Sequence, residues 1–483
     1  MPQPVAAYRY VRLADELEGQ IKDGVFRAGE KLPSIRKLTV ATGLSLTTVY
    51  QAFVELEGRG LVEPRQKSGY FVKPVLHRLL PPPRLKAHRA VPRRGSVNTL
   101  ARSVIEAMGD PDMLRLGGTV TAPELLPTRQ LSAIIRSISA ARMTQFLTTY
   151  ESPVGHLSLR REIAKRSIEM GHRIDTEDIV ITSGCIEAVG LCLRAVTQPG
   201  DTVAVESPTY PWFLQLLEDL NLYALEVSTD PSTGVDLDSL KKAVEANDVN
   251  ACLLVPNFHN PLGCLMPDPK KEALVAYLNK RTIPIIEDDI HGDLFFGRVR
   301  PTTLKAYDRR GLVLGCSSFS KTLSPGLRVG WAMPGRYADA VKRLKMNATI
   351  SSPTLNQFVI GQFLKSGGYD RHLRRLRAAL KNQASNMALS VARHFPQGTR
   401  ITAPDGGLTL WVELPSKVDG LDVFKAALGA GIAVLPGSMC SGSNRYRHFI
   451  RLSCGLPWSD AVERGIETLG VMVGRLGEGR KGA

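Results

Sequence analysis

Two residues in the second half of the chain carry side chains suited to covalent and acid–base chemistry. Lys321 lies in the run S-S-F-S-K-T-L-S-P-G-L-R, which starts with hydroxyl side chains and ends on Arg328. A lysine amine forms an imine with an aldehyde once its surroundings lower its proton affinity. Asp288 ends the apolar run I-P-I-I-E-D, and a carboxylate there can keep a pyridine nitrogen protonated, making the ring an electron sink. Taken singly, a solvated lysine and a helix-capping aspartate are the commoner interpretations.

Both residues follow segments that are typical of buried strands. From about residue 178, short apolar runs alternate with helical segments, and the runs span residues 179–182, 203–207, 251–256, 283–288, 312–318 and 327–333. Nearly continuous apolar strands separated by helices predict a mostly parallel sheet with both faces covered. Ligand sites in such sheets lie at the carboxyl ends of the strands, which is where Lys321 and Asp288 fall.

The first 72 residues predict a separate small domain of three helices and a hairpin. Apolar spacing indicates a helix over residues 8–23, and Ser34 and Ser45 are expected N-caps of two further helices. Residues 61–72 then indicate two short strands joined by a basic turn. This order predicts a winged helix-turn-helix, whose third helix enters the major groove of DNA.

Composition and charge limit the remaining possibilities. The chain has 483 residues, 62 of them Lys or Arg against 46 Asp or Glu, a formal net charge of +16. A hydrophobic fraction of 43% is typical of globular domains. The seven cysteines are scattered without a C-x-x-C pair, which indicates neither a disulfide framework nor a metal site. Without a long apolar run or a signal peptide, we expect a soluble cytoplasmic protein that does not bind membranes.

Residues 73–95 are predicted to be a linker between domains at residues 1–72 and 96–483. The segment carries seven Lys or Arg and no acid, and three consecutive prolines at 81–83 favour an extended, semi-rigid spacer. A basic spacer is well placed to lie along DNA phosphates, because that attraction needs no base sequence. A merely solvated tether is the alternative.

Three blocks of the small domain resemble the DNA-binding domain of GntR-type transcription regulators. They are G-E-K-L-P-S-I-R-K-L, G-L-S-L-T-T-V-Y-Q-A and L-E-G-R-G-L-V, at residues 29–38, 43–52 and 56–62. The resemblance implies contacts with double-stranded DNA from seven residues: Arg36, Ser45, Thr47, Thr48, Tyr50, Lys67 and Gly69. Leu46 stands where the family commonly has arginine, so no sequence preference can be carried over. A helical protein-interaction module is the alternative.

Residues from about 114 to 451 resemble the fold-type I pyridoxal-phosphate enzymes of the aminotransferase class I and II family. The resemblance rests on T-S-G-C-I-E-A, E-S-P-T-Y, N-P-L-G and the lysine run. It implies an α/β domain with a mostly parallel seven-stranded sheet, a smaller α+β subdomain and pyridoxal 5'-phosphate as the cofactor. The catalytic pair would be Lys321, which forms the imine with the cofactor aldehyde, and Asp288, which pairs with the pyridine nitrogen.

The same resemblance implies roles around the cofactor. Asn260 would bond to the ring hydroxyl oxygen, and Tyr210 would stack on the ring. Five residues would bind the phosphate: Gly184, Cys185 and Ile186 at a helix N-terminus, together with Ser318 and Arg328. Tyr150 would reach the phosphate of the partner subunit, which implies a homodimer. Arg451 would clamp the carboxylate of a substrate or effector.

Three positions depart from the family pattern. His291 stands where a tyrosine usually helps to bind the ring hydroxyl, Ile186 replaces a frequent polar residue, and Leu262 replaces the common threonine of N-P-x-G. An imidazole still donates a hydrogen bond, but it titrates near neutrality, so we expect a pH-dependent cofactor spectrum. A simply packed or surface-facing histidine is the alternative. Ile186 can act only through its backbone.

Over nearly its full length the chain resembles MocR-type transcription regulators, a GntR subfamily. The resemblance implies a DNA-binding regulator that senses pyridoxal phosphate, alone or with an amino compound, and a head-to-tail homodimer in which each small domain packs near the opposite subunit. An active aminotransferase with an attached DNA-binding domain is the alternative function. The small domain and basic linker favour the regulator, since an enzyme needs neither. A DNA-bound scaffold with an empty pocket is disfavoured, because the cofactor residues are intact.

Overall fold

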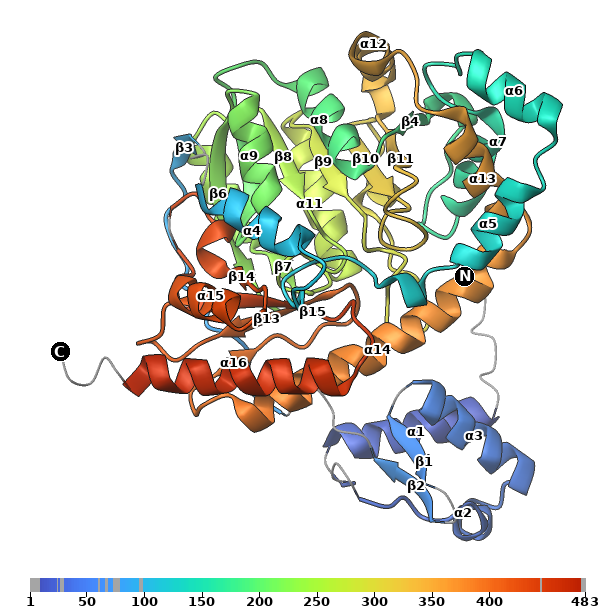
Figure 1. Cartoon of the computed structure of the whole chain (residues 1–483), viewed down its shortest axis with the longest axis vertical. Coiled ribbons are helices and arrows are strands. Elements are labelled where there is room, and N and C mark those ends of the chain that lie inside the picture. Colours follow the sequence, from blue (N-terminus) through green and yellow to red (C-terminus); the bar gives the residue numbers. More distant parts are fainter. Residues whose placement is uncertain are drawn as a thin grey trace.

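The computed structural model describes residues 9–23, 25–26, 30–59, 61–65, 68–72, 79–94, 99–443 and 445–478. A small N-terminal domain lies beside a much larger α/β domain, close to the long helix α14 (Gly368–His394) (Figure 1). No helix within the described ranges is long and apolar enough to cross a membrane.

The small domain has the element order predicted from the sequence. It consists of three helices and an antiparallel hairpin: α1 (Arg9–Asp23), α2 (Ile35–Thr42), α3 (Leu46–Gly58), β1 (Val62–Arg65) and β2 (Gly69–Val72). Ser34 and Ser45 cap α2 and α3, because each hydroxyl accepts a bond from the backbone N–H three residues later. Leu17, Phe53 and Leu56 are buried in the core between the helices. The winged helix-turn-helix prediction is confirmed.

The large domain is built on a nine-stranded sheet in the order β3-β6-β5-β8-β9-β10-β11-β4, with β7 paired to β6. The strands are β3 (Pro92–Arg94), β4 (Val180–Thr182), β5 (Thr202–Ser207), β6 (Tyr223–Asp230), β7 (Gly234–Val235), β8 (Ala251–Leu254), β9 (Ile285–Asp288), β10 (Val313–Ser318) and β11 (Gly330–Met333). Neighbours from β6 to β10 are parallel, and β11 is antiparallel to both β10 and β4. The predicted seven strands form the sheet, and the short strands β3 and β7 extend it.

Helices cover both faces of this sheet (Figure 1). One face packs against α8 (Cys185–Val196), α9 (Pro211–Asp219) and α12 (Ala338–Thr349), the other against α10 (Leu237–Ala246) and α11 (Asp268–Lys280). Four helices pack together near β4 and β11: α5 (Thr128–Arg136), α6 (Ala140–Thr148), α7 (Leu157–Arg166) and α13 (Thr354–Lys365). The carboxyl ends of the parallel strands stay open, which leaves room for a site there.

The predicted smaller subdomain contains a four-stranded antiparallel sheet in the order β12-β13-β15-β14. Its strands are β12 (Arg400–Ile401), β13 (Thr409–Glu413), β14 (Leu435–Pro436) and β15 (Phe449–Ser453). They share an apolar core with α14 and three further helices: α4 (Thr99–Gly109), α15 (Gly420–Gly429) and α16 (Asp460–Glu478).

The described part of the linker, residues 79–94, is extended but lies on the large domain. The carbonyl of Pro81 accepts a bond from Ile401, and the backbone of Arg84 donates to the Glu413 carboxylate. The last residues of the segment form β3, which pairs with the edge strand β6. The backbone of this stretch is thus held on the large domain, while Arg84, Lys86 and Arg89 remain exposed. Contact between this spacer and DNA phosphates stays a prediction.

Candidate functional site

A cavity of about 270 Å³ lies at the carboxyl ends of the parallel strands. Nine residues predicted to hold the cofactor line it: Cys185, Ile186, Tyr210, Asn260, Asp288, His291, Ser318, Lys321 and Arg328. They come from segments more than a hundred residues apart, which the sheet brings together. Five lining residues were not among the predicted site residues: Thr119, Trp212, Val255, Ile290 and Ser320. Trp212 and Ser320 lie within two residues of predicted positions, whereas Thr119 carries no recognisable signal.

Lys321 follows β10, and the segment that contains Thr119 and Thr121 holds it in the cavity. Its amine donates to the carbonyl of Thr119 at 2.6 Å, and the Thr121 hydroxyl donates to the carbonyl of Lys321, also at 2.6 Å. Burial lowers the pKa of Lys321 to about 8, and the positive charge of Arg451 acts in the same direction. A substantial fraction of the amine is therefore unprotonated at mildly alkaline pH, which is the form that attacks carbonyl carbon.

Asp288, the last residue of β9, has one carboxylate oxygen fixed by two donors. Its Oδ1 accepts from the backbone N–H of Ile290 at 3.0 Å and from the thiol of Cys185 at 3.1 Å. Burial raises the pKa of Asp288 to about 6, and both hydrogen bonds oppose that rise. A cationic ring nitrogen in the cavity would favour the ionised carboxylate further.

An anion-binding cradle closes one end of the cavity. Helix α8 begins at Cys185, so its free backbone N–H groups point into this end. Gly184 precedes it with φ of +116°, and a Cβ there would collide with a guanidinium nitrogen of Arg328. Arg328 donates to the carbonyl of Ser183 at 2.6 Å and to the Ser320 hydroxyl at 3.4 Å. Only glycine permits this close approach of the arginine to the helix.

Asn260 and Arg451 form a buried pair beside the cavity. The guanidinium donates to Asn260 Oδ1 at 2.8 Å and to the carbonyl of Gly117 at 2.7 Å. Since the amide oxygen is engaged, the Asn260 amide nitrogen is left to donate toward a ring hydroxyl oxygen. The Arg451 Nε is buried without a hydrogen-bond partner among the described residues, which suits a carboxylate ligand. Tyr210 packs on Trp212, with ring centroids 5.5 Å apart.

His291 is buried, which excludes the surface-facing alternative. Its Nδ1 lies 3.2 Å from the carbonyl of Phe258, and its Nε2 has no partner among the described residues. Burial lowers the pKa of His291 to about 3, and the nearby charge of Lys321 acts in the same direction. The imidazole therefore stays neutral at physiological pH, and the expectation that it titrates near neutrality is wrong because this site is desolvated.

These groups fit pyridoxal phosphate, because each functional group of that molecule meets a complementary group. The cradle offers donors for a phosphate, Asp288 a carboxylate for a ring nitrogen, and Lys321 an amine for an aldehyde. Tyr150 does not line this cavity: its side chain is 81% exposed, in a hollow between α6 and α13. Its role at the phosphate of a partner subunit therefore stays a prediction.

Most of the expected DNA contacts lie on the open side of the small domain. Arg36, Thr47 and Tyr50 are exposed, and Thr48 is half-buried. The Ser45 hydroxyl already serves as the cap of α3, with Thr48 Oγ1 at 2.8 Å. Gly69 in the wing has φ of +105°, a conformation that favours glycine. The expected contact from Lys67 lies outside the described residues.

The small domain contacts the large domain of its own chain through charged residues. Arg298 lies 2.6 Å from the carboxylate of Asp15 and 3.6 Å from that of Glu55. From α14, Lys381 donates to the backbone carbonyl of Arg59, the C-cap residue that follows α3. The resemblance predicts a position near the opposite subunit, whereas these contacts are made within one chain.

Arg298 belongs to the loop that follows Asp288, ten residues further along the chain. Arg300 pairs with Asp289 and, at 2.7 Å, with Asp293 inside this loop. The Tyr369 hydroxyl also donates to Asp293 at 2.9 Å. The cofactor-site carboxylate and the docked small domain are thus joined by one short, ion-paired segment.

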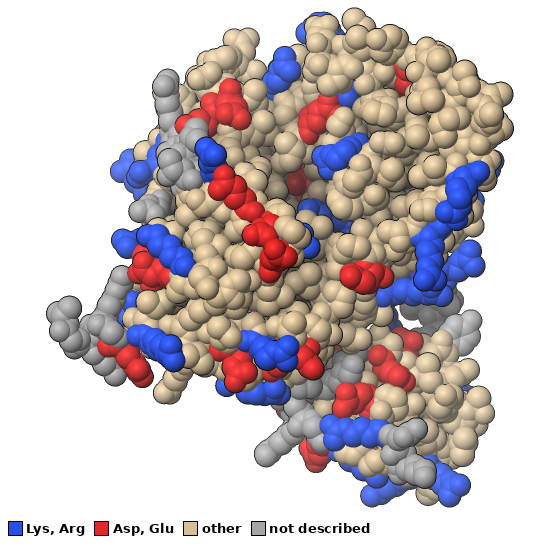
Figure 2. Space-filling model, in the orientation of Figure 1, with Lys and Arg blue, Asp and Glu red and all other residues tan. Residues whose placement is uncertain are grey.

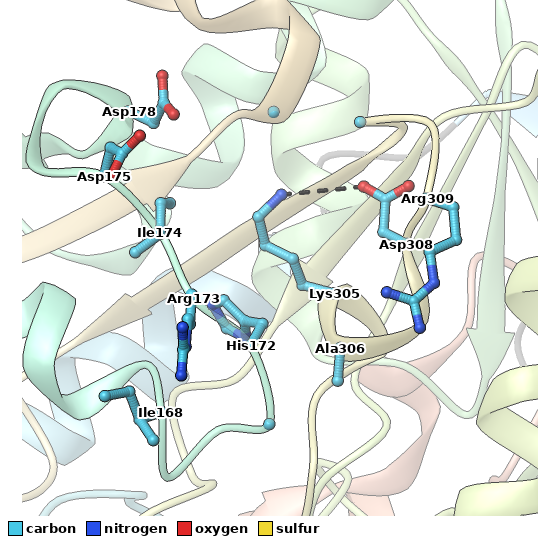
Figure 3. Close-up of a pocket in the computed structure, with 13 residues that line it drawn as sticks. Ile168, His172, Arg173, Ile174, Asp175, Asp178, Lys305, Ala306, Asp308 and Arg309 are labelled. Atoms are coloured by element: carbon cyan, nitrogen blue, oxygen red, sulfur yellow. Dashed lines mark ion pairs between the residues drawn. The ribbon is translucent and has the colours of Figure 1, made fainter.

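A larger hollow of about 720 Å³ lies at the opposite edge of the sheet (Figure 3). It is lined by residues that precede β4 and β10 and follow β11, including Asp178, Gly311 and Gly335. Its charges are of both signs: the Lys305 amine is 3.9 Å from the Asp308 carboxylate and donates to a backbone carbonyl. Because charges of both signs line this hollow, they favour no single class of ligand. Its larger volume is therefore not evidence of a functional site.

Comparison with known proteins finds two family matches in different parts of the chain. Residues 120–469 match the aminotransferase class I and II family, and residues 9–72 match the gntR family of bacterial regulatory proteins. The HTH-type transcriptional regulator YjiR of Escherichia coli (strain K12) is 37% identical, over 97% of this chain and 100% of its own. YdcR of the same strain, another HTH-type transcriptional regulator, is 36% identical over 96% and 99%.

Among solved structures, the large domain is similar to that of an aminotransferase. LysN, the alpha-aminoadipate aminotransferase of Thermus thermophilus, superposes with a TM-score of 0.71 at 29% identity. The similarity covers 80% of this chain and 96% of LysN, whose structure is complexed with N-(5'-phosphopyridoxyl)-L-leucine.

Proposed function

The chain belongs to the aminotransferase class I and II family and carries a GntR-type DNA-binding domain, and we propose that it is a transcription regulator that senses pyridoxal phosphate. In this proposal an amino compound bound together with the cofactor adds to the signal. The observation that carries the proposal is the convergence of nine predicted cofactor residues on one cavity, in a chain that also has a DNA-binding domain. The full-length similarity to HTH-type transcriptional regulators supports the regulatory role.

The cavity residues would hold the two ends of the cofactor separately. The N-terminus of α8 and the hydroxyl of Ser318 donate to the phosphate, and Arg328 adds its positive charge. At the other end, Asp288 accepts from the ring nitrogen while Asn260 donates to the ring hydroxyl oxygen. Tyr210 covers the ring face and excludes water from it.

When bound, pyridoxal phosphate supplies an aldehyde and an electron-withdrawing ring. Lys321 is the amine that meets this aldehyde, and its lowered pKa provides the unprotonated form. The neutral His291 can donate or accept one hydrogen bond without adding charge beside the ring. Asp288 keeps the proton of the ring nitrogen in place.

The ligand that joins the cofactor is expected to carry a carboxylate and an amine. The buried Nε of Arg451 lacks a partner among the described residues, and its two terminal nitrogens bond to neutral oxygens that a carboxylate can displace. The adduct in LysN contains an amino acid, leucine, which agrees with this ligand class. To act as a signal, the ligand must bind one domain arrangement more tightly than the other.

An active aminotransferase is the alternative, and the intact pair of Lys321 and Asp288 favours it. Nothing in the chemistry of the cavity separates sensing from turnover, since both use the same amine and the same carboxylate. The difference is whether protons move freely near Lys321 once an amino compound is bound.

Absorption spectra separate the two functions. The purified protein would be mixed with pyridoxal phosphate, then with a panel of amino acids, while keto acid and DNA affinity are measured in parallel. A regulator gives a visible band that shifts with one amino acid and persists without keto acid, together with a changed DNA affinity. Loss of the band with keto acid formation and unchanged DNA affinity would establish the enzyme instead. Absence of any band would refute both.

A further inference from the structure

Five arginines form an exposed cluster on the large domain, the α5–α14 arginine patch. Its members are Arg129, Arg136, Arg371, Arg374 and Arg375. Figure 2 shows Lys and Arg side chains gathered along this edge of the large domain, above the small domain. Arg129, Arg371 and Arg375 also line one hollow of about 650 Å³ between the two helices. The patch lies outside the cofactor cavity.

The acid next to the patch pairs elsewhere: Asp370, which precedes Arg371 on α14, lies 2.8 Å from Arg166. No ion pair or hydrogen bond engages these five guanidinium groups within the described part of the chain. Other exposed cations do find partners, such as Arg102 with Glu106 and Lys165 with Glu162. Glu124 is the one acid among the described residues that line the shared hollow. Five like charges held together cost repulsion, which a polyanion relieves.

The spacing links the patch to the docked small domain through Arg374. Arg371 lies three and four residues before Arg374 and Arg375, and Lys381 lies seven residues after Arg374, on the same side of α14 as that arginine. Lys381 is the residue that donates to the end of α3. At about 1.5 Å per residue, Arg374 and Lys381 are separated by roughly 10 Å along the helix. The patch therefore continues the surface on which the DNA-binding domain sits.

We propose that the α5–α14 arginine patch is a second contact surface for DNA, which binds the phosphate backbone beyond the half-site read by the small domain. Arginine forks match phosphate oxygens in two-bonded geometry, and phosphate contacts need no base sequence. The proposal rests on the DNA-binding function of the small domain. The patch adds affinity for DNA and fixes the direction of the duplex relative to the large domain. It adds no preference for a base sequence.

The lengths of the two helices limit how far the patch lies from the groove-reading end of α3. Helix α3 spans 13 residues, about 20 Å, and Arg374 lies about 10 Å from Lys381 along α14. A path of about 30 Å corresponds to roughly nine base pairs at about 3.4 Å each. A duplex extended by about ten base pairs beyond the half-site is therefore long enough to cover that path.

The test is a triple variant, Arg371→Gln with Arg374→Gln and Arg375→Gln, in the full-length protein. Glutamine keeps the helix propensity and removes three charges. The matched control removes three exposed charges elsewhere on the large domain: Lys280→Gln, Arg309→Gln and Arg343→Gln. Both variants and the parent protein are titrated with short and extended duplexes at several salt concentrations. Dimer content is followed by size-exclusion chromatography.

The triple variant is expected to bind the extended duplex about tenfold or more weakly, with the slope of log K against log salt smaller by about 2 to 3. Its affinity for the short duplex and that of the control for both duplexes stay within about twofold of the parent. Equal losses in variant and control would reduce the effect to net charge and overturn the proposal. Unchanged binding of the extended duplex would also overturn the proposal. Loss of the dimer would overturn it too, because the patch would then be a subunit interface. A parent protein that binds no duplex refutes the DNA-binding function itself.

Discussion

Cys185 was expected to act through its backbone, but its thiol also donates to Asp288 at 3.1 Å. This bond opposes the rise in the pKa of Asp288, which burial takes to about 6. Cys185→Ala should therefore raise that pKa further, by about one unit if the bond is worth about 1.4 kcal/mol. Cys185→Ser keeps a donor and should change it little.

The measurement is cofactor affinity between pH 5 and 8. Below its pKa the carboxyl is neutral and loses its attraction for a protonated ring nitrogen, so affinity falls as pH falls. The midpoint of that fall should lie about one unit higher in the alanine variant. Cys252→Ala, at a buried cysteine of β8, controls for lost packing. Superimposable profiles for the parent and Cys185→Ala would show that the thiol only fills space.

Lys321→Ala should abolish the visible absorption band that the protein gives with pyridoxal phosphate, because no other amine lines the described cavity. Basal DNA affinity should stay largely unchanged, since the small domain keeps its own core. Lys305→Ala is the matched control, a lysine also buried but at the opposite edge of the sheet. A band that persists in Lys321→Ala would mean that the cofactor binds elsewhere.

Most of the polar lining of the cavity could be predicted residue by residue, because its members stand in short motifs at strand ends. The pKa of His291 could not, since desolvation depends on Phe258 and other groups that only the fold brings near. Thr119 was missed for a similar reason: its backbone carbonyl, not its side chain, meets Lys321 across 202 positions of the sequence. Every residue has a backbone carbonyl, so the residue type at position 119 cannot indicate this contact.

At the scale of elements, α3 and the wing are expected to read DNA together. Thr48→Ala combined with Lys67→Ala should weaken DNA binding and reduce the slope of log K against log salt by about one, because one charged phosphate contact is lost. Since Thr48 also bonds to the Ser45 hydroxyl at 2.8 Å, circular dichroism must confirm that α3 remains folded. Unchanged affinity in a folded variant would contradict the groove assignment.

The loop from Asp288 to Arg298 joins the cavity to the contact with the small domain, and we predict that it transmits the effect of the cofactor. Arg298→Glu places a like charge beside Asp15 and Glu55, which should loosen the docking. Exposed pairs contribute about 0.2 to 1 kcal/mol each, so the effect of the cofactor on DNA affinity should change by about two- to fivefold. Combining Asp15→Arg with Arg298→Glu should restore part of it. A cofactor response identical in all variants would exclude this loop as the link.

The parallel strands could be predicted as elements because their apolar runs are nearly unbroken. Strand β3 could not, since Pro92, Arg93 and Arg94 have no strand propensity of their own. They pair with Tyr223, Ala224 and Leu225 only because the edge of β6 is left open by the large domain. Here the tertiary context decides the local structure.

At the scale of the whole molecule, the exposed Tyr150 is predicted to serve the cofactor phosphate of a second chain. Mixed dimers test this: one chain carries Tyr150→Phe and the other Lys321→Ala. If Tyr150 serves the partner's phosphate, one of the two sites in each mixed dimer has a native lysine and a native tyrosine. Cofactor affinity near that of the parent should return at about half of the sites. Failure to recover it, with dimers present, would place Tyr150 outside the cofactor site.

The bound linker also sets how far the small domain can travel. Between Val72 and Leu79 there are seven Cα steps, which span at most about 25 Å. Because this connection is so short, the effective concentration of the small domain around its own large domain is in the millimolar range or above. Contacts too weak to join separate molecules, such as Arg298 with Asp15, are therefore populated. A few weak contacts can therefore favour one position of the small domain without preventing it from leaving. This suits a protein that must release and rebind DNA.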